Sequence, residues 1–159
     1  MKHVLKTYFL GVCFFALFFP LALKGQPEKK EQVRQLLEKG EFTVEFHKAL
    51  PLGKTAKNLF PTYEMHIKGT IVDTYLPYFG RHHHAPADPS NLSLILKDTE
   101  VDLVQEKGKK GKTIFRFSTK IPHNELLDFT LTVEAGGMAQ LSVTSSTRSA
   151  ITYLGQVKL

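Results

Sequence analysis

Hydrophobic and polar residues alternate along most of the chain after Gly40, and this alternation constrains the fold more than any other feature. In the first such segment, Phe42, Val44 and Phe46 occupy every second position. A period of two places successive side chains on opposite faces of a β-strand. The pattern predicts roughly nine strands, centred on 42–46, 63–67, 71–77, 92–97, 101–105, 115–117, 129–133, 141–143 and 151–157.

The connections between these segments are mostly short, and the alternation leaves one face of each strand polar. Both properties favour antiparallel pairing, and Gly136-Gly137 marks a tight hairpin. We therefore expect a mainly β (α+β) fold, an antiparallel sheet of roughly nine strands that is barrel-like or a two-sheet sandwich. Residues 49–61 and 79–91 are predicted to be long loops, which often carry function.

One helix is predicted, from Pro27 to Lys39. Proline is favoured in the first turn of a helix. Val33, Leu36 and Leu37 form a narrow apolar stripe, and Gly40 is a plausible stop. A stripe this narrow indicates a short N-terminal helix that lies on a larger structure.

The N-terminal segment differs from the rest of the chain. Lys2 and Lys6 precede an almost uninterrupted apolar run at 7–23, which is the pattern of a secretory signal peptide. We expect cleavage after Gly25, before Gln26, leaving 26–159 as a single exported β-rich domain that is periplasmic or extracellular. The alternative is an uncleaved membrane anchor, although the run is short for a spanning helix.

Cys13 is the only cysteine. It lies inside the apolar run and follows Val12, so the chain is not expected to be a lipoprotein or, after cleavage, to contain a thiol. Loss of the three lysines of the signal segment lowers the formal net charge from +6 to +3. This mild basic balance, together with export, argues against a nucleic-acid partner.

An aromatic run precedes the second predicted loop. Tyr75, Tyr78 and Phe79 could line a ligand pocket. Alternation puts Tyr75 and Phe79 on one face and Leu76 and Tyr78 on the other, so one pair is expected in the core. The alternative is that the run is only a strand end.

Two arginines are candidates for ligand binding. Arg81 follows the aromatic run, and Arg148 stands among serines and threonines. Arginine makes forked hydrogen bonds to anions. The alternative for Arg148 is structural, in which it bonds backbone carbonyls or an acidic partner of its own chain.

Three consecutive histidines follow Arg81. On an extended segment His82 and His84 would point the same way and could share a metal with Asp88. The alternative is a polar loop. The sequence supplies no metal-binding helix motif and no cysteine pair to support a metal site, and no cofactor is predicted.

Residues 107–112 form a lysine-rich turn that could contact anionic lipid or polysaccharide, or could be only a solvated turn. Catalytic signatures are missing, since the chain has no Gly-x-Ser-x-Gly motif and no thiol outside the signal segment. A carboxylate pair assembled in space stays open.

Three stretches together resemble a known family. They are Leu76-Pro77-Tyr78-Phe79-Gly80-Arg81, the Gly136-Gly137 hairpin that leads to Leu141-Ser142-Val143, and the run from Ser145 to Gly155. The chain resembles the domain-of-unknown-function family 4251, exported proteins typical of Bacteroidetes. The resemblance implies export and a shared fold but no activity, and the three histidines depart from its pattern.

The sequence therefore predicts a non-catalytic exported domain that binds a small ligand or a cell-envelope partner through residues 76–88. A structural or assembly protein of the envelope is the first alternative. A metal-dependent hydrolase that uses His82, His84 and Asp88 is the second.

Overall fold

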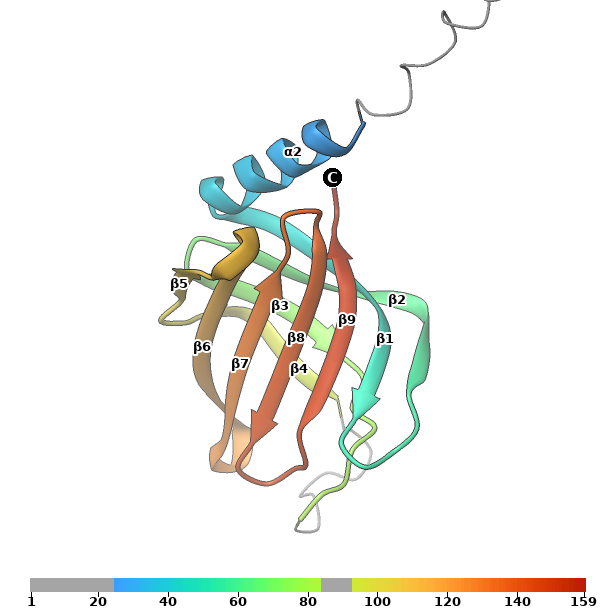
Figure 1. Cartoon of the computed structure of the whole chain (residues 1–159). Helices are drawn as coiled ribbons and strands as arrows, with labels where there is room; N and C mark the ends of the chain where they lie inside the picture. Colours follow the sequence, from blue (N-terminus) through green and yellow to red (C-terminus); the bar gives the residue numbers. More distant parts are fainter. Residues whose placement is uncertain (1–24, 84–92) are drawn as a thin grey trace, which may run out of the picture.

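A computed structural model describes residues 25–83 and 93–159 of the 159-residue chain. One nine-stranded antiparallel sheet curls into a half-barrel, and one helix lies across its end (Figure 1). The elements follow one another as α2 (Gly25–Lys39), β1 (Glu41–Pro51), β2 (Lys57–Lys68), β3 (Ile71–Leu76), β4 (Leu94–Glu100), β5 (Val104–Lys107), η1 (Lys109–Gly111), β6 (Thr113–Ile121), η2 (Pro122–Asn124), β7 (Glu125–Val133), β8 (Met138–Ser145) and β9 (Ile151–Val157).

The sheet is not closed. Its strand order is β4-β3-β2-β1-β9-β8-β7-β6-β5, so β4 and β5, which are consecutive in sequence, form the two edges. The prediction of a mainly antiparallel β fold with one short helix is confirmed. Of the two predicted forms, the barrel-like one is confirmed rather than the two-sheet sandwich, because all the strands of the described residues belong to one curled sheet.

Side chains fill the concave face of the sheet. Tyr153, Phe46, Phe115 and Phe129 are among the largest fully buried residues. They come from two pairs of neighbouring strands, β9 with β1 and β6 with β7. Phe117 stacks on Phe129 with 4.7 Å between ring centroids. The interior is a packed core, and its dispersion contacts and apolar burial hold the curled sheet together.

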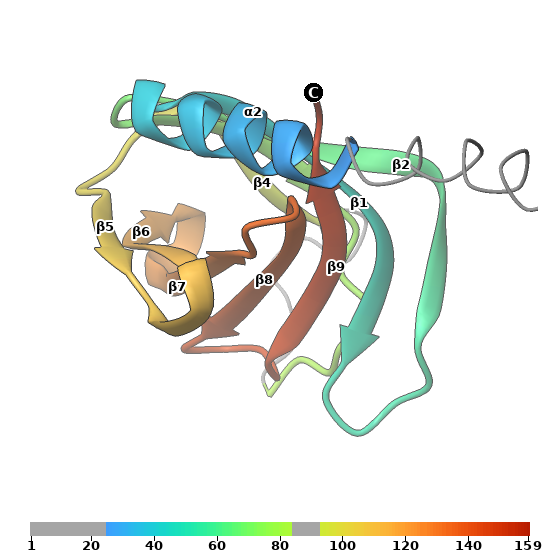
Figure 2. The ribbon, with the colours of Figure 1, turned by 45° about the horizontal axis from the view of Figure 1, so that its top comes forward.

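Helix α2 covers one end of the half-barrel (Figure 2). Val33 and Leu37 of the predicted stripe are buried, 1% and 3% exposed. Gly40 has a φ of +70° and ends the helix, which matches the left-handed geometry favoured at this position. The turn between β7 and β8 packs beneath the helix, since a Cβ on Gly137 would lie 3.1 Å from Val33 Cγ2.

The prediction of a long loop at 49–61 is wrong. β1 continues to Pro51 and β2 begins at Lys57, so residues 52–56 are the whole connection. A bulge between Phe46 and Lys48 shifts the register of β1 against both neighbouring strands. The extra residue of the bulge shifts which positions of β1 face the core. The alternation of hydrophobic residues seen from Phe42 to Phe46 is therefore interrupted, although the strand continues.

Two other differences are smaller. Helix α2 begins at Gly25 rather than at Pro27. The fifth strand spans Val104–Lys107, whereas Val101 lies in the preceding connection and is buried. In the described part of the chain, no helix is long and apolar enough to cross a membrane.

Candidate functional site

The segment after β3 is tied to the segment between β8 and β9, at the end of the half-barrel opposite α2 (Figure 1). The Ser149 N–H donates to the Arg81 carbonyl at 2.9 Å, and the His83 N–H donates to the Thr147 carbonyl at 2.8 Å. His82 and Arg148 form an isolated antiparallel bridge. Two parts of the family motif, distant in sequence, are therefore adjacent in space.

Tyr78 lies at the centre of this junction. Its hydroxyl oxygen is 2.7 Å from the Ser149 carbonyl oxygen and 3.0 Å from that of Arg81, so both carbonyls compete for its single proton. Burial raises the pKa of the Tyr78 hydroxyl. The Arg148 guanidinium carbon lies 5.2 Å from the centre of the Tyr78 ring, in cation–π geometry.

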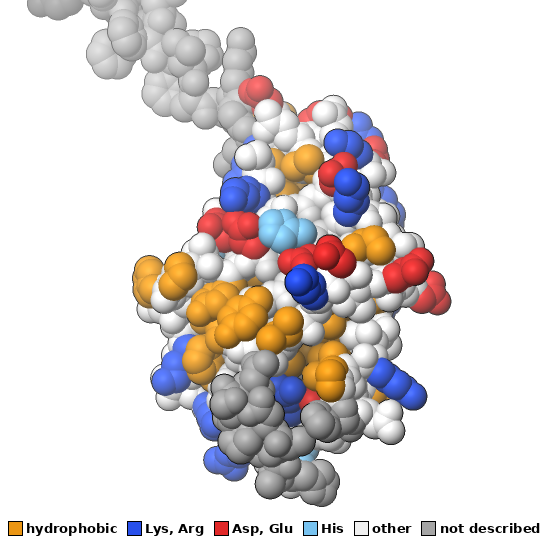
Figure 3. Space-filling view, turned by 180° about the vertical axis from the view of Figure 1, so that it is seen from behind, with side chains coloured by type: hydrophobic (Ala, Val, Ile, Leu, Met, Phe, Trp, Pro, Cys, Tyr) orange, Lys and Arg blue, Asp and Glu red, His pale blue; other side chains and the backbone are white. Residues whose placement is uncertain are grey.

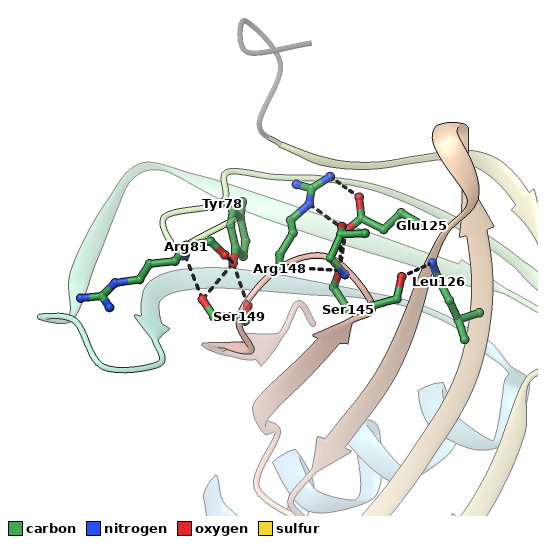
Figure 4. A network of polar contacts seen from close by, with 9 residues as sticks. Tyr78, Arg81, Glu125, Leu126, Ser145, Arg148 and Ser149 are labelled. Carbon is green, nitrogen blue, oxygen red and sulfur yellow. Dashed lines mark hydrogen bonds and ion pairs between the residues drawn. The ribbon is translucent and has the colours of Figure 1, made fainter. Parts of the chain in front are cut away.

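Arg148 forms a buried, forked ion pair with Glu125 (Figure 4). The Nε–Oε1 and Nη2–Oε2 distances are both 2.8 Å, and the two side chains are only 8% and 9% exposed. Burial acts to raise the pKa of Glu125, but hydrogen bonds from Arg148 and then Ser145 outweigh it, and the net pKa is lowered. We call Tyr78, Glu125, Ser145, Arg148 and Ser149 the polar corner.

Ser145 completes the polar corner. Its hydroxyl donates to Glu125 Oε1 and accepts the backbone N–H groups of Thr147 and Arg148, both at 3.0 Å. The predicted anion-binding role of Arg148 calls for an external carboxylate or phosphate. Here Glu125 supplies the carboxylate from within the chain, which favours the structural interpretation of Arg148.

Arg81 differs from Arg148. Its backbone N–H donates to Ser149 Oγ at 2.8 Å, while its exposed side chain extends away from the polar corner (Figure 4). Phe79 is half-buried and packs against the core. The Lys54 ammonium donates hydrogen bonds to the carbonyl oxygens of Phe79 and Gly80, at 2.9 and 3.0 Å. Among the predicted site residues that the structure describes, Arg81 is therefore the one whose charged side chain is exposed to solvent at this end.

The predicted metal site falls mostly outside the described residues, which include His82 but not His84 or Asp88. Among residues 25–83 and 93–159, no group of three His, Cys, Asp or Glu side chains is placed to hold a metal ion. His82 contacts the Tyr78 ring edge-on, with centroids 5.4 Å apart. Burial, then the nearby Arg148 charge, lowers the pKa of His82.

Tyr75, the first residue of the aromatic run, lies on the outer face of β3 and is 51% exposed. Its ring stacks on Tyr63 of β2 with a centroid distance of 6.1 Å and an interplanar angle of 25°. It pairs across the ladder with Ile95 of β4, itself 40% exposed. We call Tyr63, Tyr75 and Ile95 the aromatic patch, and hydrophobic side chains gather over this face (Figure 3).

Hydrogen-bonding groups border the aromatic patch. Ser93 Oγ donates to the Tyr75 hydroxyl at 3.0 Å. Glu64, which follows Tyr63 on β2, accepts a hydrogen bond from the Lys158 ammonium at 2.8 Å. The sequence identified Tyr75 but not its neighbours, because the patch combines three strands. Only the register, in which Tyr75 faces Ile95, brings these residues together.

The carboxylates with lowered pKa values are dispersed. Arg34 lowers the pKa of Glu31, Lys158 that of Glu64, and Arg148 that of Glu125. These three glutamates lie on α2, β2 and β7 respectively. Each shift thus reflects a local ion pair rather than the shared environment of two catalytic carboxylates.

The architecture defines a half-barrel β-protein with a helix across one end. Residues 24–157 match the model of the domain of unknown function DUF4251, and the chain belongs to this family. The structure is similar to the crystal structure of a DUF4251 family protein from Bacteroides eggerthii DSM 20697. The TM-score is 0.58 at 14% identity over 81% of this chain and 86% of that one, which shows a shared fold. A search of curated proteins found no match.

Proposed function

We propose that this protein is an exported, non-catalytic domain that binds a saccharide of the cell envelope through the aromatic patch. The sequence predicted a binding surface at residues 76–88. Leu76 and Tyr78 are buried, 0% and 8% exposed, so the proposal moves the contact surface to Tyr75 and its neighbours. Arg81, exposed at the end of the same run, is a second contact.

The observation that carries the proposal is the 51% exposure of Tyr75 on the outer face of a sheet. Its ring stacks on Tyr63, which is half-buried and packs against the core. Clustered apolar side chains on a protein surface are typical of interaction sites, and tyrosine is prominent among residues that dominate binding energy. A stacked pair anchored in a sheet loses little conformational entropy when it binds.

The chemistry of the patch favours a sugar ring. A pyranose has apolar C–H faces, which suit a flat aromatic surface, and equatorial hydroxyls, which need hydrogen-bonding partners at the edge. Tyrosine supplies both an apolar ring and a polar hydroxyl. Ser93 and Glu64 add polar groups beside the rings.

Titration calorimetry with soluble fragments of cell-wall glycan tests the proposal. Replacement of Tyr75 by Ala should weaken binding by roughly tenfold or more, as loss of a binding aromatic costs at least about 1–2 kcal/mol. Val104→Ala is the matched control, because Val104 is 48% exposed on β5, away from the patch. Equal affinities for the Tyr75→Ala variant and the unsubstituted protein would refute the proposal.

A structural role in the envelope is the second candidate. The filled interior and the internally bonded polar corner favour it, since both serve folding. Complementation of a strain that lacks the protein separates the two candidates. A structural role predicts that the Tyr75→Ala/Arg81→Ala variant restores the strain fully, whereas the binding role predicts that it does not.

A further inference from the structure

A groove lies between α2 and the β5–β6 hairpin. It is at the end of the half-barrel that α2 covers, and Figure 2 shows how the helix and the hairpin are arranged there. Its volume is about 330 Å³, which is at the lower end of the range for small-ligand sites. We call it the basic groove, and its lining includes Lys30, Val33, Leu37, Lys107, Lys112 and Glu134.

Positive charge exceeds negative charge at the basic groove. Its two acidic side chains are already paired, Glu31 with Arg34 at 2.7 Å and Glu134 with Lys112 at 2.9 Å. Lys30 and Lys107 then remain among the lining residues without an ion pair to any described residue.

The hairpin tip adds to this excess. Lys109 and Lys110, in the turn η1, are both exposed. Lys30, Lys107, Lys109 and Lys110 are exposed and form no ion pair with any described residue, whereas Arg34 is shared between Glu31 and Glu38. Cations still outnumber acidic groups among the residues that line the groove, and the surface is complementary to an anionic partner.

Apolar groups accompany these charges. Val33 and Leu37 form a buried floor under the basic groove. On the other side of α2, Leu36 and Leu159 line a second hollow, and Leu159 is 60% exposed. Met138, which follows the turn that packs against α2, is 56% exposed. Basic and apolar side chains at the same end are typical of proteins that bind at a membrane interface.

The sequence outside the described residues favours the same partner. The apolar run at 7–23 ends shortly before Gly25, where α2 begins. A segment of that composition is expected to enter a bilayer during export. The apolar run therefore joins the domain at α2, the same end that carries the exposed lysines.

We propose that this end of the half-barrel docks on an anionic phospholipid surface, with Lys30, Lys107, Lys109 and Lys110 meeting the phosphates. Exposed Met138 and Leu159 contact the interfacial region. This docking surface is separate from the aromatic patch on β2–β4 and does not depend on saccharide binding. Each basic residue held near an anionic membrane strengthens binding about fivefold.

Vesicle co-sedimentation tests the proposal with protein expressed from the full chain, purified after export, and checked by mass for its N-terminus. Vesicles of phosphatidylglycerol mixed with phosphatidylcholine should bind it, and vesicles of phosphatidylcholine alone should bind it far less. Added salt should weaken the binding, because it screens the exposed lysines.

The decisive variant is Lys107→Gln/Lys109→Gln/Lys110→Gln, which should reduce binding to the anionic vesicles by on the order of 100-fold. The matched control is Lys57→Gln/Lys97→Gln/Lys120→Gln, which removes three exposed lysines from β2, β4 and β6. Its expected loss is several-fold at most. All six positions are exposed strand or turn residues, and thermal unfolding verifies that both variants fold.

Equal losses for the two variants would overturn the proposal, because they would show attraction by net charge alone. A second result would also overturn it. If soluble dextran sulfate binds the protein through Lys107, Lys109 and Lys110 while anionic vesicles do not bind, the surface is a polysaccharide site rather than a membrane-docking site.

Discussion

Tyr78 of the polar corner and Tyr75 of the aromatic patch are three residues apart in one sequence run, yet they have opposite environments. Tyr78 is 8% exposed, and its hydroxyl bonds two carbonyls of its own chain. Tyr75 is 51% exposed, and its hydroxyl accepts a bond from Ser93. The polar corner is held by hydrogen bonds and an ion pair within the chain, whereas the aromatic patch keeps surface available. Their comparison separates residues that hold the fold from residues free to bind a partner.

The largest expected effect is at the ion pair of the polar corner. Arg148→Met should lower the free energy of unfolding by about 3–5 kcal/mol, because it leaves the Glu125 carboxylate buried without its partner. Urea denaturation measures the change. Arg116→Met is the matched control, since the Arg116–Glu106 pair is about half exposed, and it should cost no more than about 1 kcal/mol.

The double variant Arg148→Met/Glu125→Leu sharpens this test. It removes both buried charges, and it should recover most of the stability lost by the single variant. A double variant as unstable as Arg148→Met would show that packing of the side chains, rather than an unpaired charge, explains the loss.

Removal of the Tyr78 hydroxyl should have the next largest effect. Tyr78→Phe leaves the Ser149 and Arg81 carbonyls without this donor, and an unsatisfied buried acceptor costs about 1–3 kcal/mol. Chemical denaturation of the variant gives the value. A loss below about 0.5 kcal/mol would mean that water replaces the hydroxyl, and the polar corner would then be less dry than its burial indicates.

Acid should destabilise the protein through His82, whose ring contacts Tyr78 of the polar corner. Burial and then Arg148 lower the pKa of His82 in the folded protein below its usual value of 6.5. The resulting stability is present above pH 6.5 and is lost as the pH falls through the folded-state pKa. Between pH 7 and pH 5, the free energy of unfolding should therefore fall more for the unsubstituted protein than for the His82→Gln variant. Parallel unfolding free energies for the two proteins over this interval would contradict the proposed environment of His82.

The smallest expected effect is at the aromatic patch. Tyr75→Phe removes an exposed hydroxyl and should change the free energy of unfolding by less than about 0.5 kcal/mol. The same denaturation experiment compares it directly with Tyr78→Phe. A loss as large as that of Tyr78→Phe would erase the distinction between the two regions and would favour the structural role for the whole run.

Much of the fold could be predicted, because alternation of hydrophobic residues reports directly which strand faces are buried. It located the helix, the hairpin at Gly136-Gly137 and roughly nine strands. It failed at residues 49–61, where the bulge after Phe46 breaks the period although pairing continues to Pro51. The alternation within one segment cannot show that a strand continues beyond a bulge. Pairing past the bulge depends on the register between two strands, which one segment does not contain.

The candidate site was less predictable. Arg148 stood out as an arginine among serines, but its partner Glu125 lies 23 residues away and had no distinguishing pattern. Tyr75 was identified, but Tyr63 and Ile95 were not grouped with it. These groupings arise from pairing between strands, and a single sequence does not state which positions on two strands face each other.

By itself the sequence determined the secondary-structure class, the family and which faces of the strands are apolar, because these depend on residue type and local spacing. The tertiary structure alone decided that the sheet forms an open half-barrel, that Arg148 is neutralised by Glu125, and that lysines of the β5–β6 hairpin lie beside those of α2. Each of these depends on distances between segments remote in sequence. Burial and electrostatic interaction depend on distances in space. The ion pair and the shared lysine surface therefore form only when folding brings these segments together.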